Sequence, residues 1–445
     1  MTERKNYTEA DIKAIIKEKK VEFLKLQFCD INGQIKNLCL PVSQLDKVLN
    51  NEVMLDGSSI KGFRSIETSD MNFYPDLSTF AILPTNTNAV HARLICDIYN
   101  TDGTPFEGCP RVNLKRVIEK AKKMGLEMIV GPEAEFFLFK RDANGQLTMD
   151  THDNAHYYDA APDDMGEYIR TQIIRSISEL GFDVEASHHE VAKGQHEIDF
   201  KYADALTSAD NIITFRYIVK TIARANGQHA TFMPKPIYGI NGSGLHCNLS
   251  LFKNGKNTFY DPKRAHQLSE IALYSIGGLL DHVRSFTAIT NPTVNSYKRL
   301  VPGYEAPVYL AWSLANRSAL IRIPMKRGNA TRAELRSPDP SCNPYLAFAV
   351  ILESILDGIQ KKTKPPLDID KNIFKMDDRE RKRSKIETLP GSLYEALMLM
   401  KKSAIVKSAL GEHIFKEFLQ SKLMEWDGYR TSVTPYELDM YLERY

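Results

Sequence analysis

Two glutamates stand two residues apart in an apolar run, Gly131-Pro-Glu133-Ala-Glu135-Phe-Phe-Leu-Phe139. Successive side chains of a strand point to opposite faces, so a strand here places Glu133 and Glu135 on one face. Neighbouring carboxylates repel one another unless a cation lies between them. Phe137 and Phe139 continue the same face, which is unusual for a face in contact with water. The run predicts a metal or ligand site, and a solvated strand face is the alternative.

Two further segments carry side chains suited to this chemistry. The first is His188-His-Glu190-Val-Ala-Lys-Gly194-Gln-His-Glu197, whose central Lys-Gly pair indicates a turn. Glu190 and Glu197 can then face each other across a hairpin, where their hard oxygen ligands suit magnesium or manganese. A plain surface hairpin is the alternative. The second is Asn241-Gly-Ser-Gly244-Leu-His246, a glycine-rich turn entering a strand, in which His246 is either a ligand or a structural histidine.

Arginines gather further along the chain. In Thr331-Arg332-Ala-Glu334-Leu-Arg336 the strand period places the three charged side chains together. A carboxylate flanked by two guanidiniums suits a site that holds both metal and anionic oxygens, and a cross-strand salt-bridge ladder is the alternative. More charged residues lie upstream, at Arg299, Glu305, Arg317 and Arg322. Arginines that recur through one segment are suited to a phosphate or carboxylate pocket.

These segments together supply carboxylates, one histidine and several arginines. A divalent metal held by glutamate side chains, together with arginines, is typical of sites for nucleotide-dependent phosphoryl transfer. The sequence has no Walker loop, so the phosphates must be held by metal and side chains. A further loop, Asp56-Gly-Ser-Ser59, is a plain turn when it is taken alone.

Composition narrows the class of protein. The 445 residues carry 58 lysines and arginines against 56 aspartates and glutamates, a net charge of +2 that argues against nucleic acid as a main ligand. No apolar run approaches the roughly 20 residues of a membrane span, and the N-terminus lacks the apolar core of a signal peptide. Six scattered cysteines fit reduced thiols, so we expect a cytoplasmic protein.

The pattern of elements indicates two domains. Residues 1–105 read as a small β-rich domain, and a stretch rich in Gly, Pro and Asn closes it. Residues 106–445 alternate extended and helical segments and form a larger domain. The expected fold class is α+β.

Eight motifs stand in family order, and together they resemble bacterial type I glutamine synthetase over essentially the whole chain. They are Asp56-Gly-Ser-Ser, Gly-Pro-Glu133-Ala-Glu135-Phe, His-His-Glu190, Gln-His-Glu197-Ile, Phe232-Met-Pro-Lys-Pro236, Asn241-Gly-Ser-Gly-Leu-His246, Asn291-Pro-Thr-Val-Asn-Ser-Tyr-Lys-Arg299 and Arg332-Ala-Glu334-Leu-Arg336. The resemblance implies an N-terminal β-grasp domain and a larger catalytic domain with a curved antiparallel sheet and surrounding helices. It also implies a homododecamer of two hexameric rings, with active sites between subunits.

The resemblance assigns roles to positions of this chain. One divalent metal, Mg²⁺ or Mn²⁺, would be held by Glu135, Glu190 and Glu197, and a second by Glu133, His246 and Glu334. The glutamate site would comprise Glu135, Asn241, Gly242, His246, Arg299 and Arg336. ATP would be held by Tyr202, Ser250 and Arg332, with Arg322 and Arg317 near its phosphates. A neighbouring subunit would lend Asp56 and Asp70 to the ammonium site, and Glu305 would close over the intermediate.

The implied reaction is the ATP-dependent ligation of ammonia to L-glutamate through a γ-glutamyl phosphate, in nitrogen assimilation. A carboxylate is a poor electrophile, so ATP must first activate it, and two metals would hold the reactants in line. Arg317 would stabilise the transferring phosphoryl group. Asp56 would bind ammonium and take its proton. Glu305 would exclude the water that hydrolyses the intermediate.

Two departures from the family pattern bear on regulation. Phe374 occupies the place of the tyrosine that enterobacterial-type members modify, so adenylylation is not expected. The compact length instead resembles the Gram-positive subtype, which is inhibited by glutamine and signals to small repressor proteins. In that subtype an arginine follows the Asp-Gly-Ser-Ser loop, whereas here Ser65 holds its place and Arg64 stands one residue early. We therefore expect altered glutamine inhibition, and identical inhibition of wild type and Ser65→Arg would refute this.

Three alternatives remain open at the level of sequence. A γ-glutamyl-amine ligase of the same superfamily would replace ammonia by an amine, but the intact Asp56 and Asp70 favour ammonia. A catalytically silent relative would act as a structural or regulatory assembly, yet no metal-ligand or catalytic position is missing. An active enzyme could also signal to a repressor protein of nitrogen regulation. No direct contact with nucleic acid or membrane is expected.

Overall fold

The computed structural model describes residues 5–84, 88–304, 306–369, 371–384 and 386–445, and the N-terminal part forms a small sheet of its own. Its strand order is β2-β1-β5-β4-β3, in which only β1 and β5 run parallel. Thr8 and Asp11 form a reciprocal capping box that begins the first helix. The elements are α1(Glu9–Lys19), β1(Phe23–Cys29), β2(Ile35–Pro41), α2(Leu45–Leu49), β3(Met54–Asp56), β4(Asp70–Ile82) and β5(His91–Asn100).

The larger part is built on a second sheet, whose main path is β14-β15-β16-β12-β6-β9-β8. Its pairs are antiparallel except for the short pair β14 and β15. The long strand β6 is central, because β7, β10 and β11 also pair with it. The strands are β6(Glu127–Arg141), β7(Leu147–Thr151), β8(Val184–His189), β9(Gln195–Phe200), β10(Ala203–Asp204), β11(Gln228–Thr231), β12(Leu245–Lys253), β13(Lys256–Asn257), β14(Trp312–Ser313), β15(Ile321–Arg322) and β16(Ala333–Leu335).

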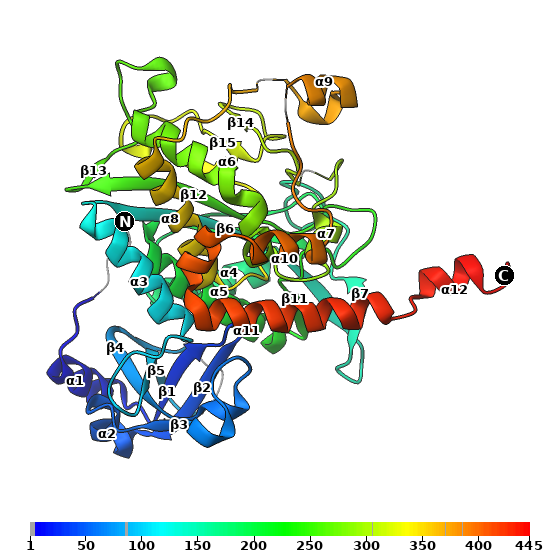
Figure 1. Ribbon diagram of the computed structural model, residues 1–445. Helices are drawn as coiled ribbons and strands as arrows, with labels where there is room; N and C mark the ends of the chain where they lie inside the picture. Colours follow the sequence, from blue (N-terminus) through cyan, green and yellow to red (C-terminus); the bar gives the residue numbers. More distant parts are fainter. Residues whose placement is uncertain (1–4, 85–87, 305, 370, 385) are drawn as a thin grey trace.

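Helices cover this sheet (Figure 1). The most apolar of them, α8, begins where Asn343 caps a proline at the first helical position, and it is buried along almost its whole length. Near the C-terminus, α12 buries no residue and projects away from the rest of the molecule (Figure 1). The helices are α3(Pro110–Lys123), α4(Glu167–Glu179), α5(Ala205–Ala225), α6(Glu270–Thr290), α7(Ser296–Arg299), α8(Pro344–Lys361), α9(Asp378–Arg383), α10(Leu393–Lys401), α11(Ala404–Thr431) and α12(Pro435–Tyr441).

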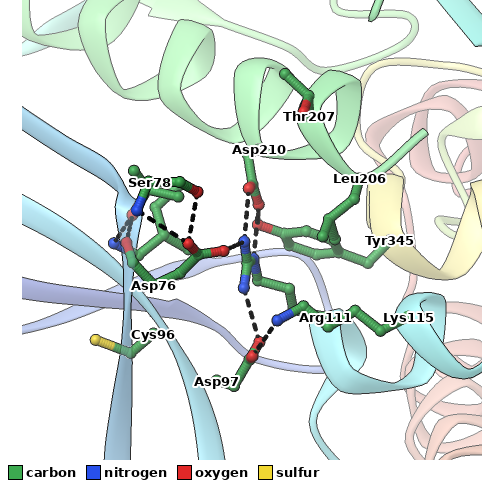
Figure 2. A network of polar contacts seen from close by, with 12 residues as sticks. Asp76, Ser78, Cys96, Asp97, Arg111, Lys115, Leu206, Thr207, Asp210 and Tyr345 are labelled. Atoms are coloured by element: carbon green, nitrogen blue, oxygen red, sulfur yellow. Dashed lines mark hydrogen bonds and ion pairs between the residues drawn. The ribbon is translucent and has the colours of Figure 1, made fainter. Parts of the chain in front are cut away.

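A buried arginine joins the two parts of the molecule (Figure 2). Arg111 on α3 contacts Asp76 at 2.6 Å and Asp97 at 2.9 Å, both in the N-terminal sheet. The same guanidinium also meets Asp210 of α5 at 3.0 Å, and the hydroxyl of Tyr345 donates to that carboxylate. Several hydrogen bonds to each buried charge are what makes such a cluster tolerable in a low-dielectric interior. The cluster therefore sets how the N-terminal sheet sits on the larger part.

The predicted α+β class is confirmed, since both sheets are accompanied by helices. In the part of the chain that the structure describes, no helix has both the length and the apolar character needed to cross a membrane.

Candidate active site

The central strand β6 brings the predicted acidic residues together. Glu133 lies opposite His246 of β12, and Glu135 lies opposite Glu197 of β9. Strands on both sides of β6 therefore contribute to one polar surface, although their residues are far apart in the sequence. This surface holds two groups whose possible ligand atoms lie within 4.8 Å of one another.

The first group comprises Glu133, His246 and Glu334. His246 Nδ1 lies 3.3 Å from the Glu133 carboxylate, which also accepts a 2.8 Å hydrogen bond from Asn248. Burial opposes ionisation of Glu133, but His246 and Asn248 outweigh it and hold its pKa below the usual range. Burial, followed by the nearby Arg336, lowers the pKa of His246. A neutral imidazole beside carboxylates is suited to bind a divalent metal.

The second group comprises His188, Glu190 and Glu197. The predicted hairpin is confirmed, but its register differs from the expectation that Glu190 and Glu197 oppose one another. Glu197 instead lies opposite His188, and Glu190 begins the turn. His188 lies 3.5 Å from Glu190 and 3.9 Å from Glu197. Sequence reasoning did not count His188 as a ligand, although it belongs to the same motif.

Glu135 lies beside this second group and is only 7 % exposed. Its carboxylate accepts hydrogen bonds from Gln195 at 2.8 Å and from the backbone of Gly244 at 2.9 Å. Burial, together with the charge of Glu190, raises the pKa of Glu135 to about 8. Burial and the neighbouring Asp199 also raise the pKa of Glu197. So many buried carboxylates repel one another in the absence of a cation, and a divalent ion would relieve that repulsion.

A buried polar network supports the hairpin from behind, and sequence reasoning missed it. Asp153 accepts hydrogen bonds from the backbone of Gly194 at 3.1 Å, and its carboxylate lies 3.1 Å from Nε2 of His189. His196, on the partner strand, lies 2.8 Å from the buried Arg170. Asp153 precedes Gly194 of the hairpin turn by 41 residues, so no local pattern could connect the two. The network holds the turn that carries Glu190.

The arginine segment forms contacts that differ in part from the sequence expectation. Glu334 is flanked by two guanidiniums, but they belong to Arg336 at 2.5 Å and Arg322 at 2.6 Å. Arg322 lies directly across from Glu334 in the sheet, so this contact is a cross-strand salt bridge. Arg332 instead donates a 2.8 Å hydrogen bond to Asn248. The strand period predicted the shared face, but only strand pairing decided which arginine meets the carboxylate.

Two cavities open on this surface. A small one of about 30 Å³ is lined by all the residues expected at the glutamate site, namely Glu135, Asn241, Gly242, His246, Arg299 and Arg336. Arg299 is buried and donates to the backbone of Ser337 and Arg336. The second cavity, of about 400 Å³, is lined by Tyr202, Ser250 and Arg332, the residues expected to hold the nucleotide. Glu133 also lines it, which places the first group between the two cavities.

Arg317 lines neither cavity but lies beside the second group. It is exposed and hydrogen bonds the hydroxyl of Tyr157, whose ring packs against His188 with centroids 5.5 Å apart. Asp56 and Asp70 are paired across β3 and β4 in the N-terminal sheet, and both are exposed. Neither aspartate lines the two cavities. Glu305 lies outside the described residues.

Comparison with known proteins decides the family. The model described as "Glutamine synthetase, catalytic domain" matches residues 107–441, and "Glutamine synthetase, beta-Grasp domain" matches residues 20–101. The chain belongs to the glutamine synthetase family. It is 56 % identical to a glutamine synthetase of Thermus thermophilus over 99 % of this chain and 100 % of that protein. Its identity to one of Staphylococcus aureus is 54 %, again over 99 % and 100 %. A solved GmaS–ADP complex shares 30 % identity with a TM-score of 0.88, and the match covers all of both chains.

Membership over the full length confirms the expected activity and fold. The chain is a glutamate–ammonia ligase that forms glutamine with ATP. Its N-terminal sheet is the β-grasp domain, and the family uses ATP and divalent metal. The donor sets described above fit such a metal, because they consist of carboxylate oxygens and imidazole nitrogens.

Proposed function

We propose that the two ligand groups each hold one Mg²⁺ or Mn²⁺ ion and that the reaction takes place between the two cavities. The supporting observation is that Glu133, His246 and Glu334 lie between a cavity lined by the expected nucleotide residues and one lined by the expected glutamate residues. One ion would be bound by these three residues. The other would be bound by Glu135, Glu190 and Glu197, with His188 close enough to take part.

The side chains around the small cavity would orient glutamate. Asn241, Gly242 and His246 form one wall, while Arg299 and Arg336 supply positive charge for its carboxylates. Bound divalent ions neutralise phosphate charge and polarise the transferring phosphoryl group. Tyr202, Ser250 and Arg332 would hold the nucleotide so that its phosphates point toward Glu133. Arg317 and Arg322 would stabilise negative charge as the γ-glutamyl phosphate forms.

The ammonium site would be completed by a neighbouring subunit. Asp56 and Asp70 are exposed in the N-terminal sheet and line neither cavity of their own chain. An assembly that brings them to the next subunit's cavities would supply the base that takes the ammonium proton. Ser58 lowers the pKa of Asp56, which keeps this carboxylate ionised and able to bind a cation. We propose a homododecamer of two hexameric rings, and Glu305 as the residue that closes over the intermediate.

The regulation that we propose rests on the sequence similarity to glutamine synthetases of Gram-positive bacteria. The proposed enzyme lacks adenylylation because Phe374, which packs near Tyr309, has no hydroxyl to modify. Signalling to a repressor protein and altered glutamine inhibition at Ser65 stay predictions. So do a cytoplasmic location and a domain boundary near residue 105. The two largest hydrophobic cores, which apart from Cys29, Phe106 and Cys109 each draw on one part of the chain, support that boundary.

The test of the chemistry is phosphate release with glutamate, ATP and magnesium, with and without ammonium, hydroxylamine or small amines. Amide formation should require glutamate and ammonium together, and a preference for a small amine would instead indicate an amine ligase. Glu305→Ala should uncouple phosphate release from amide formation. Asp56→Ala should slow the ammonium step, whereas the matched exposed control Glu52→Ala should not. Unchanged turnover in both active-site variants would refute the assigned roles.

Mixing variants tests whether sites are shared between subunits. Asp56→Ala chains should be slow, and Glu334→Ala chains inactive, in ammonium ligation. If they are unfolded together and reassembled, some sites combine an intact Asp56 from one chain with an intact Glu334 from another. Activity should then reappear in the mixture. No recovery in mixed assemblies of normal size would show that each chain supplies its own ammonium site.

A further inference from the structure

A third cavity, of about 940 Å³, lies away from the residues assigned to the reaction. Its walls come from the hairpin loop between β1 and β2, from α5, β11 and α11, and from the segment 292–295. None of the proposed metal, glutamate or nucleotide residues lines it. The cavity therefore requires an explanation separate from catalysis.

Five positive side chains line this cavity, among mostly apolar neighbours. Three of them, Arg216, Lys220 and Arg224, follow one another at four-residue spacing along α5 and so lie on one face of the helix. Arg141 of β6 and Lys422 of α11 line the same space. Like charges at this spacing destabilise a helix, so their alignment has an energetic cost that helix formation alone does not explain.

Nearby negative charge does not balance these side chains. Among the residues that the structure describes, Glu425 is the single carboxylate lining the cavity, and it already accepts from Lys422 at 2.8 Å and from the backbone of Val294 at 3.2 Å. Within the described ranges, Lys220 and Arg224 form neither an ion pair nor a side-chain hydrogen bond. Five cations thus face one carboxylate in a chain whose total net charge is only +2.

Arg216 is only 9 % exposed and, unlike the similarly buried Lys422, forms no ion pair with a carboxylate in the described structure. One of its terminal nitrogens donates to the backbone of Cys342 at 2.6 Å, but its Nε has no partner in the described structure. The Nε of Arg141 is likewise buried without a partner. These Nε atoms are closed to the cavity, so an anion there would act through charge alone. A buried guanidinium without an anionic partner is costly, and an anion bound in the cavity would reduce that cost. Burial and the neighbouring Arg216 also lower the pKa of Lys220, as expected for a cation among cations.

We propose that this cavity binds a small anion that carries at least two negative charges on oxygen atoms, either a phosphate group or a polycarboxylate. The guanidinium of Arg216 would hold it in the interior, the half-buried Arg141 would add positive charge from the end of β6, and Lys220 and Arg224 would contact it nearer the mouth. Hydroxyls of Thr221 and Ser341 line the same walls and can donate further hydrogen bonds. The site is distinct from the two cavities of the active site.

The test uses the assembled full-length protein, freed of metal and kept in a buffer of low ionic strength. Inorganic phosphate and citrate are titrated separately by calorimetry, with chloride as the monovalent control. Wild type should bind at least one of the two multivalent probes, and Lys220→Gln or Arg224→Gln should weaken that binding about tenfold or more. Lys416→Gln, an exposed lysine of α11 outside the cavity, should leave the affinity unchanged.

The melting temperature gives a second readout, because the proposal fixes the direction in which it differs between wild type and variant. Without a multivalent anion, Lys220→Gln should melt at a higher temperature than wild type, because one repelling charge is removed. With the anion, wild type should gain stability and the variant should gain much less. Equal affinity in wild type and both α5 variants would place the anion elsewhere, and no binding of either probe would overturn the proposal. Binding of phosphate alone or citrate alone would identify the ligand class.

Discussion

The raised pKa of Glu135 predicts that the metal-free enzyme loses stability as the pH rises. The folded protein holds a proton on this carboxyl up to about pH 8, whereas the unfolded chain releases it near the ordinary value of 4.5. Between those values the folded state binds more protons, so the free energy of unfolding falls by about 1.4 kcal/mol per pH unit. From pH 6.5 to pH 8 the expected loss is roughly 2 kcal/mol. The raised pKa of Glu197 acts in the same direction.

Histidines also titrate near the start of this window. The buried His196 and His246 have lowered pKa values while their unfolded imidazoles are still half-protonated at pH 6.5, so they oppose the Glu135 slope there and lose that influence toward pH 8. His189 has a raised pKa and adds to the loss, so the contribution of Glu135 is read from the difference between wild type and a variant of that residue. The assay is urea unfolding of EDTA-treated protein at several pH values in this range. Saturating Mg²⁺ should abolish the loss, because a bound cation keeps the carboxylate ionised in the folded state.

Glu135→Gln isolates the contribution of this one group. The variant lacks the titrating carboxyl but keeps the acceptor for Gln195 and Gly244, so its slope should be smaller than that of wild type by about 1.4 kcal/mol per pH unit. The exposed control Glu52→Gln should keep the wild-type slope. If Glu135→Gln and wild type respond identically to pH, the buried proton does not reside on Glu135 and the reasoning fails.

Three further predictions concern metal binding and stability. Glu334→Ala removes a proposed ligand and should weaken Mn²⁺ binding in calorimetry by at least about 100-fold, and unchanged affinity would exclude this residue as a ligand. Asp153→Asn weakens the support of the hairpin and should cost about 10- to 100-fold in Mn²⁺ affinity, with nucleotide binding retained as the control. Arg111→Met leaves three carboxylates without their shared cation and should lower the free energy of unfolding by about 3–5 kcal/mol in urea. A loss below about 1 kcal/mol would show that the cluster is not desolvated as the structure indicates.

Patterns of neighbouring residues determined much of the local structure of this protein. The period of two in β6 already places Glu133 and Glu135 on one face, and Thr8 with Asp11 specifies where the first helix begins. The glycine between β8 and β9 marks the hairpin turn, since Gly194 adopts a positive φ that other residues rarely take. These features depend on neighbours within a few residues, so they can be predicted without knowledge of the fold.

Only the tertiary structure decided which of these faces meet. Arg322, rather than Arg332, pairs with Glu334 because strand register, set by the packing of the whole sheet, brings it opposite. Asp153 supports the hairpin from about forty residues away, and Arg216 joins a cationic cavity whose walls come from distant segments. Side-chain period fixes direction along one strand or helix, whereas register and burial depend on contacts between elements far apart in the chain. The sequence alone therefore determined the types of residue available for the chemistry, and the fold decided their partners.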